Sequence, residues 1–186
     1  MPGNQKQRDS VLFNLINLVG FQAGWWLLIL YQQQYWWVVA GFLILHIASV
    51  PSRLNEVLVI FSTALSGVLI DSVLALLGVY IFSDSGQFLP VPYWLVLLWL
   101  VFAATVRHSL SYLRDKYWLA AALGAVGGPL SYLGGMKLGA VDFGYRPAAV
   151  LAILSIIWAC LMPVIFLISH CVEAQLRQHV DAKVSG

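Results

Sequence analysis

A single carboxylate within a long apolar run is the residue with the clearest capacity for chemistry. Asp71 lies in "GVLIDSVLALLG", residues 67–78. A carboxylate in hydrocarbon must be protonated, hydrogen-bonded, paired with a cation or in contact with water, because an isolated buried charge is costly. Two interpretations follow. Asp71 is either a neutral, hydrogen-bonded structural residue or a group that responds to protons or cations.

Other polar residues fall at helical spacing in apolar runs. Asn14, Asn17 and Gln22 occupy one half of the first predicted helix, where their amides could bond a neighbouring helix or line a cavity. Glu56 shares a helix face with Asp71, but it lies near the helix end, so we expect its carboxylate to remain in contact with water.

The segment "GAVGGPLSYLGGMKLGAV", residues 124–141, is unusually rich in glycine. Glycines four residues apart, such as Gly124 and Gly128, let another helix approach closely. Pro129 removes one backbone N–H and crowds the preceding turn, which predicts a kink. Freed backbone groups at such a depth survive when they are buried in protein or line a cavity. Close packing and ligand binding are therefore both open for this segment.

These observations define a hypothetical ligand-binding set in the membrane. Its members are Asn14, Asn17, Gln22, Asp71, Gly128, Pro129 and Lys137.

A second group of residues lies in "RHSLSYLRD", residues 107–115. Arg107, His108 and Arg114 could contact lipid phosphates at the membrane interface. The alternative is that they anchor the helix end by charge alone.

Three histidines, His46, His108 and His170, follow one another at intervals of 62 residues. Three imidazoles could bind zinc, copper or iron. However, the sequence lacks the His-Glu-x-x-His motif, the Gly-x-Ser-x-Gly nucleophile motif and a phosphate-binding loop. We therefore expect interfacial histidines, no metal or other cofactor, and no catalytic residue that can be assigned.

The elements that must position these residues are transmembrane helices. The chain of 186 residues is 61% hydrophobic and only 10% charged, and apolar runs of about 20 residues match the ~30 Å hydrocarbon core. Turn residues and charges separate six predicted helices, at about residues 10–31, 35–50, 55–82, 90–113, 117–141 and 146–170. The prediction is an all-α polytopic bundle whose fifth helix is Gly-rich and kinked at Pro129.

Positive charge predicts the orientation of the bundle, because Lys and Arg accumulate on the cytoplasmic side. With both termini in the cytoplasm, only Lys137 and Arg146 face outward, and all other lysines and arginines face inward. We expect a short cytoplasmic tail at 1–9, one transmembrane domain at 10–170 and a cytoplasmic tail at 171–186. A net charge of +2 provides no broad basic surface and so argues against a nucleic-acid partner.

The sequence resembles an uncharacterised bacterial inner-membrane family, defined only as a domain of unknown function. The resemblance rests on "FQAGWW" at 21–26, "GVLIDS" at 67–72, "FAATVRHSL" at 102–110 and the glycine–proline block at 124–141. It implies a location in the bacterial inner membrane. Genes of that family often lie near those of fatty-acyl-modifying methyltransferases, which implies lipid chemistry by association, and the family supplies no catalytic residues.

Three functions remain open. The first is non-enzymatic binding or transport of a small molecule or lipid, with a site between the first, third and fifth helices. The second is a membrane enzyme or enzyme subunit in lipid or fatty-acid modification, built around His46, Arg107 and His108. The third is a scaffold whose Gly-x-x-x-Gly faces bind another copy or a different membrane protein.

Overall fold

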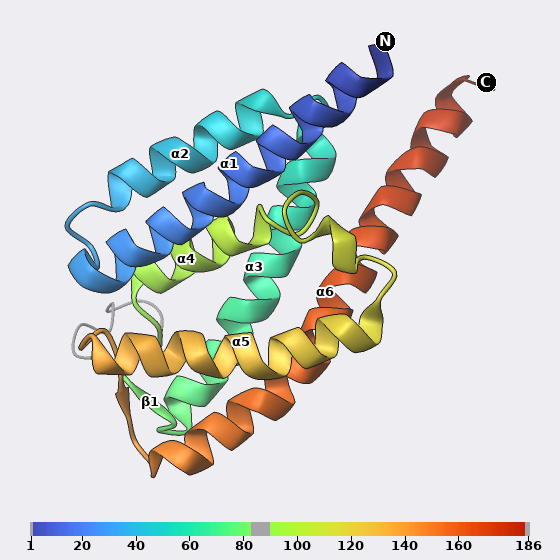
Figure 1. Ribbon diagram of the computed structural model, residues 1–186. Coiled ribbons are helices and arrows are strands. Elements are labelled where there is room, and N and C mark those ends of the chain that lie inside the picture. The colour runs from blue at the N-terminus through green and yellow to red at the C-terminus, as the bar shows by residue number, and fades with distance from the viewer. Residues whose placement is uncertain (1, 83–89, 185–186) are drawn as a thin grey trace.

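Helices form nearly all of the structure (Figure 1). The computed structural model describes residues 2–82 and 90–184. Within these residues the helices are α1 (Pro2–Tyr31), α2 (Trp36–Ser49), α3 (Arg53–Leu76), α4 (Tyr93–Ala103), α5 (Tyr117–Lys137) and α6 (Pro147–Val184). The remaining elements are a 3-10 turn, η1 (Ser111–Leu113), and two short strands, β1 (Tyr80–Ile81) and β2 (Asp142–Phe143). The predicted all-helical fold is confirmed.

Four of these helices are long and apolar enough to cross a membrane. The qualifying segments are Ser10–Tyr31, Arg53–Leu76, Tyr117–Lys137 and Pro147–Leu176. The helices α2 and α4 are equally apolar but shorter, with 14 and 11 residues. At ~1.5 Å per residue, α4 is only ~16 Å long.

The fourth helix is shorter than the predicted 90–113, because the chain leaves helical geometry after Ala103. The Thr105 hydroxyl donates to the carbonyl of Phe102 at 2.6 Å, and the Asn17 amide donates to the carbonyl of Ala104 at 3.1 Å. Side chains that bond backbone groups in this way offer the chain an alternative to the helix. Residues 104–110 consequently form a series of turns before η1.

Two other helices end earlier than predicted, and a glycine with positive φ lies two residues beyond the last residue of each. Gly78 (φ +69°) follows α3, and Gly139 (φ +77°) follows α5. In both cases the residue after the glycine donates its N–H to a carbonyl five residues back, as in a Schellman cap. The two caps lead into β1 and β2, which pair antiparallel through Tyr80↔Phe143 and Ile81↔Asp142.

The helix α3 crosses the middle of the molecule and contacts α2, α4 and α6, while α1 packs on α2 and α4 (Figure 1). The Gly-rich helix α5, for which the sequence left close packing and ligand binding open, packs mainly on α6. The start of α1 and the end of α6 lie at the same end of the molecule. The described parts of the expected tails, 2–9 and 171–184, continue these two helices.

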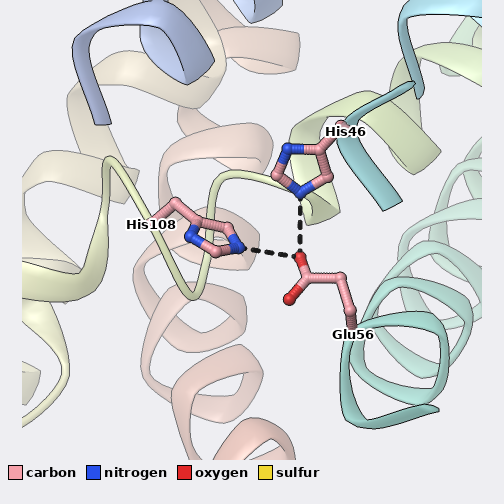
Figure 2. A group of neighbouring side chains, drawn as sticks. All are labelled: His46, Glu56 and His108. Atoms are coloured by element: carbon pink, nitrogen blue, oxygen red, sulfur yellow. Dashed lines mark hydrogen bonds and ion pairs between the residues drawn. The ribbon is translucent and has the colours of Figure 1, made fainter. Parts of the chain in front are cut away.

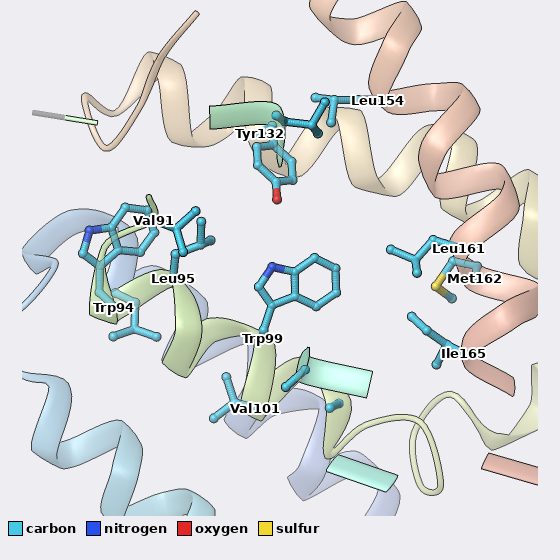
Figure 3. Close-up of a cluster of buried hydrophobic side chains, with 14 of the residues drawn as sticks. Val91, Trp94, Leu95, Trp99, Val101, Tyr132, Leu154, Leu161, Met162 and Ile165 are labelled. Atoms are coloured by element: carbon cyan, nitrogen blue, oxygen red, sulfur yellow. The ribbon is translucent and has the colours of Figure 1, made fainter. Parts of the chain in front are cut away.

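The glycines of α5 serve close packing on α6. A Cβ at Gly128 would lie 2.2 Å from the Trp158 ring, and one at Gly124 would lie 2.5 Å from the Trp158 carbonyl oxygen. The helix continues through Pro129 without an interruption in its helical residues. Trp158 also stacks on Trp99 of α4, with ring centres 5.3 Å apart and planes 11° apart. Figure 3 shows Trp99 between Tyr132 on one side and the α6 residues Leu161, Met162 and Ile165 on another.

Candidate functional site

Glu56 is the centre of a buried polar cluster at the end of the bundle where α2 leads into α3. It lies in the first turn of α3 and is 1% exposed. Its Oε1 accepts from Nε2 of His46 at 3.0 Å and from Nε2 of His108 at 3.1 Å (Figure 2). Its Oε2 accepts from the Arg107 guanidinium at 2.8 Å. The expectation that the Glu56 carboxylate remains in water is wrong, because three other side chains cover it.

Three separate elements bring these groups together. His46 lies in the last turn of α2, which ends at Ser49, and residues 50–52 then connect α2 to α3. Arg107 and His108 come from the turns that follow α4. The two imidazoles contact each other edge to face, with ring centres 4.9 Å apart. The loss of helix after Ala103 is therefore what positions both Arg107 and His108 against Glu56.

Arg107 links this cluster to α6. Its Nε donates to Glu173 at 3.0 Å while its terminal nitrogen bonds Glu56. Glu173 also pairs with Arg114. Two guanidinium groups thus face two carboxylates, and the four charges balance without a charge on either imidazole. Buried charges survive only when paired and hydrogen-bonded, as they are here.

Asn17 holds the other side of the cluster. Its Nδ2 lies 3.5 Å from Nδ1 of His46 and donates to the carbonyl of Ala104. Its Oδ1 accepts from the Ser109 hydroxyl at 2.7 Å. The amide therefore fixes both the His46 ring and the turns that carry His108.

Asp71 belongs to a second buried cluster, toward the other end of α3. Its Oδ2 accepts from the Trp99 indole at 2.7 Å and from the Tyr132 hydroxyl. Tyr80 stacks on Tyr132 with ring centres 4.9 Å apart, and its own hydroxyl is buried without a hydrogen-bond partner among the described residues. No lysine, arginine or histidine pairs with Asp71 among the residues that the structure describes.

A pocket and a groove adjoin this second cluster. The pocket has a volume of about 60 Å³ and is lined mostly by aromatic rings, including Trp99 and Tyr132. The groove, of about 480 Å³, runs between α1 and α5 and is lined by Gln22, Gly127 and Gly128 among others. Both cavities share five lining residues, which makes them neighbours: Phe21, Trp25, Phe102, Ser131 and Trp158.

The residues of the hypothetical ligand-binding set do not form one site. Asn17 joins the Glu56 cluster, Asp71 forms the second cluster, and Gln22 and Gly128 line the groove. Asn14 is partly buried on α1, Pro129 is buried in α5, and Lys137 is exposed at the end of α5.

The interfacial and histidine groups are placed as follows. Arg107, His108 and Arg114 bond to the carboxylates of Glu56 and Glu173. His46 and His108 meet at Glu56, whereas His170 lies beside Arg114 and Asp115. The interval of 62 residues thus brings together two of the three histidines.

Sequence reasoning missed Glu173, Trp99 and Tyr132. Glu173 lies beyond the last apolar run, which gave no reason to expect a continued helix. Trp99 and Tyr132 resemble ordinary interfacial or packing aromatics. The only available signal was Asp71 itself, because a buried carboxylate needs donors on neighbouring helices.

Four apolar helices of membrane-spanning length, enclosing two buried polar clusters, define a polytopic helical protein of the membrane type. The chain belongs to the family described as protein of unknown function (DUF2878), which it matches over residues 14–164. Neither a curated protein nor a solved structure matches the sequence. The family match includes all the site residues above except Glu173 and His170.

Proposed function

We propose that this protein binds an amphipathic small molecule or lipid within the membrane, in the groove between α1 and α5. The volume and lining of this groove are the observation that carries the proposal. Its walls are mainly apolar, with Gln22 and Ser131 as polar exceptions. A ligand site of several hundred Å³ with few polar groups is the usual form of a small-molecule site.

The proposed setting is the inner membrane of a bacterium, with six crossings and both termini in the cytoplasm. Charge supports this orientation, because all but two of the lysines and arginines then lie on the cytoplasmic side. The start of α1 and the end of α6 lie at the same end of the molecule, which agrees with an even number of crossings (Figure 1). In this setting the Glu56 cluster lies toward the cytoplasm, and the Asp71 cluster lies toward the outside.

Trp25 lies at the junction between groove and pocket, because its side chain lines both. Its indole N–H donates to the Ser131 hydroxyl at 2.9 Å, which joins α1 to α5. Trp25 is thus one of the residues that a ligand occupying both cavities would contact.

The Asp71 cluster favours a ligand that carries a positive charge. Trp99 and Tyr132 donate their hydrogen bonds to Asp71, so these donors are already used and only the rings of the two residues line the pocket. Electron-rich aromatic faces attract ammonium groups, and Asp71 has no cationic partner among the described residues. An amphipathic amine would place its apolar part in the groove and its ammonium group in the aromatic pocket.

The test is profiling of lipids and metabolites that remain with the purified protein. We expect an amphipathic amine to be enriched over the detergent extract of the same membranes. Gly127→Leu should remove it, because Gly127 lines the groove and a Cβ there meets no atom within 4 Å in the part of the chain that the structure describes. Gly41→Leu is the matched control, since Gly41 also has open space but lies in α2, away from the groove.

The outcomes separate the parts of the proposal. Equal retention by the wild-type protein and Gly127→Leu would contradict a site in the groove. A neutral ligand that Gly127→Leu removes would support the groove and contradict the amine. A wild-type protein that retains nothing above background would contradict binding of a tightly held ligand.

A membrane enzyme or enzyme subunit in lipid modification is the second candidate. One observation favours it: His46 and His108 reach the same oxygen of Glu56. A carboxylate that orients an imidazole is a common arrangement for acid–base catalysis. Deletion of the gene should then change the cellular lipid profile, and only a chain with His108 should restore it. The scaffold has less support, because Gly124 and Gly128 already pack on α6.

A further inference from the structure

The Glu56 cluster has the composition of a metal site, and this inference is independent of the proposed ligand groove. One ring nitrogen of His46, one ring nitrogen of His108 and a carboxylate oxygen of Glu56 all lie within 4.8 Å of one another. We propose that these three residues bind one divalent transition metal ion of the zinc class. Glu56 then takes the place that the sequence pattern assigned to His170.

The distances between the donor atoms suit a metal of this size. Zinc binds imidazole nitrogen and carboxylate oxygen at ~2.0–2.2 Å, so that adjacent ligand atoms in a tetrahedral site lie roughly 3.3–3.6 Å apart. The two Nε2–Oε1 distances are 3.0 and 3.1 Å. Both imidazoles point at the same oxygen of Glu56 (Figure 2), and an ion among the three donors requires each nitrogen to move away from that oxygen by ~0.2–0.6 Å.

The donor set also limits which metals fit. Two imidazoles and one carboxylate are the protein ligands of several catalytic zinc sites and of non-haem iron sites, which keep open positions for water or substrate. Magnesium and calcium prefer oxygen ligands. The cluster should therefore bind Zn²⁺ or Co²⁺ far more tightly than Mg²⁺ or Ca²⁺.

The surrounding residues supply an outer shell. Arg107 bonds Oε2 of Glu56 at 2.8 Å, which leaves Oε1 directed at the two imidazoles. Binding of the metal at both Nε2 atoms moves each imidazole hydrogen to Nδ1. At His46 this Nδ1 lies 3.5 Å from Nδ2 of Asn17, so the Asn17 side chain, which also bonds the Ala104 carbonyl, must shift to accommodate the hydrogen.

The experiment measures metal on the full chain purified in detergent with an affinity tag that contains no histidine. After incubation with Zn²⁺ and removal of the excess, we expect about one equivalent in the wild-type protein, by elemental analysis. Titration with Co²⁺ should give visible absorption bands typical of nitrogen and oxygen ligands, and excess Mg²⁺ should not remove them. A folded wild-type protein that binds less than a tenth of an equivalent overturns the proposal.

Matched histidine variants locate the ion. His46→Gln and His108→Gln should each weaken Zn²⁺ binding by more than about 100-fold, since even second-shell changes cost 10–100-fold. His170→Gln is the control, because His170 lies outside the cluster, and it should bind like the wild type. Equal binding by all three variants would place the metal elsewhere and overturn the assignment. The wild-type measurement and His108→Gln, whose side chain is partly exposed, keep the test decisive if another variant fails to fold.

Discussion

Trp99 donates its indole N–H to Asp71 over 2.7 Å, across the contact between α4 and α3. Gly67 makes the contact possible, because a Cβ at that position would lie 2.3 Å from the Trp99 ring. Tyr132 of α5 donates its hydroxyl to the same carboxylate oxygen. Three helices therefore meet at one acceptor, so Asp71 contributes to the fold whatever ligand occupies the neighbouring pocket.

Two substitutions separate the effect of the Asp71 hydrogen bonds on stability from the effect of its negative charge. Asp71→Leu leaves the Trp99 and Tyr132 hydrogens without an acceptor, and it should lower the free energy of unfolding by about 2–5 kcal/mol. Asp71→Asn retains an acceptor oxygen and should cost less than about half as much. Thermal unfolding in detergent, followed by circular dichroism, measures both. Equal stability of the two variants would contradict the role of Asp71 as a shared acceptor.

Adjacent glycines of α5 should respond in opposite ways to the same substitution. Gly128→Ala places a methyl group 2.2 Å from the Trp158 ring and should cost about 1–3 kcal/mol through overpacking. The methyl group of Gly127→Ala meets none of the described residues within 4 Å, so this variant should be neutral, or more stable by up to ~1 kcal/mol through helix propensity. Unfolding temperatures of the two variants in the same detergent provide the comparison. A stable Gly128→Ala protein would mean that α5 and α6 do not pack as described.

Arg107 should be the most sensitive of the basic residues. It bonds Glu56 and Glu173, so Arg107→Ala leaves two buried carboxylates without this partner and should cost about 3–5 kcal/mol. Arg146→Ala removes an exposed arginine and should change stability by less than about 0.5 kcal/mol. The comparison requires only thermal or denaturant unfolding of both variants. Similar losses in both would show that α6 is not held by Arg107.

Hydropathy was sufficient to predict the helices, because apolar runs of about 20 residues have few alternatives to a membrane helix. It could not predict where α3, α4 and α5 end. Two of these ends depend on the positive φ of Gly78 and Gly139, and the third on a hydrogen bond from Asn17, 87 residues away in the sequence. The sequence around Ala104 does not indicate that Asn17 bonds its carbonyl, so the end of α4 could not be predicted from it.

For the candidate sites, too, the sequence predicted some residues and not others. The sequence identified Asp71, His46 and His108 as residue types that need an explanation in an apolar chain. It could not identify their partners, because those depend on how helices pack. Glu56 is a clear case: its position near a helix end indicated contact with water, but His46 of α2 and Arg107 and His108 from the turns after α4 bond its carboxylate, and only 1% of the residue is exposed.

The parallel stack of Trp99 and Trp158 gives this protein a spectroscopic signature of its own. Two indoles with planes 11° apart and centres 5.3 Å apart are close enough for their electronic transitions to couple. Such coupling should add a paired positive and negative band to the ultraviolet circular dichroism spectrum, beside any contribution of the Trp25–Trp26 pair, whose ring centres are 5.0 Å apart, and the difference spectrum between the wild type and Trp158→Phe should isolate it. The band would report in real time whether α4 and α6 stay in register while the chain binds, folds or moves.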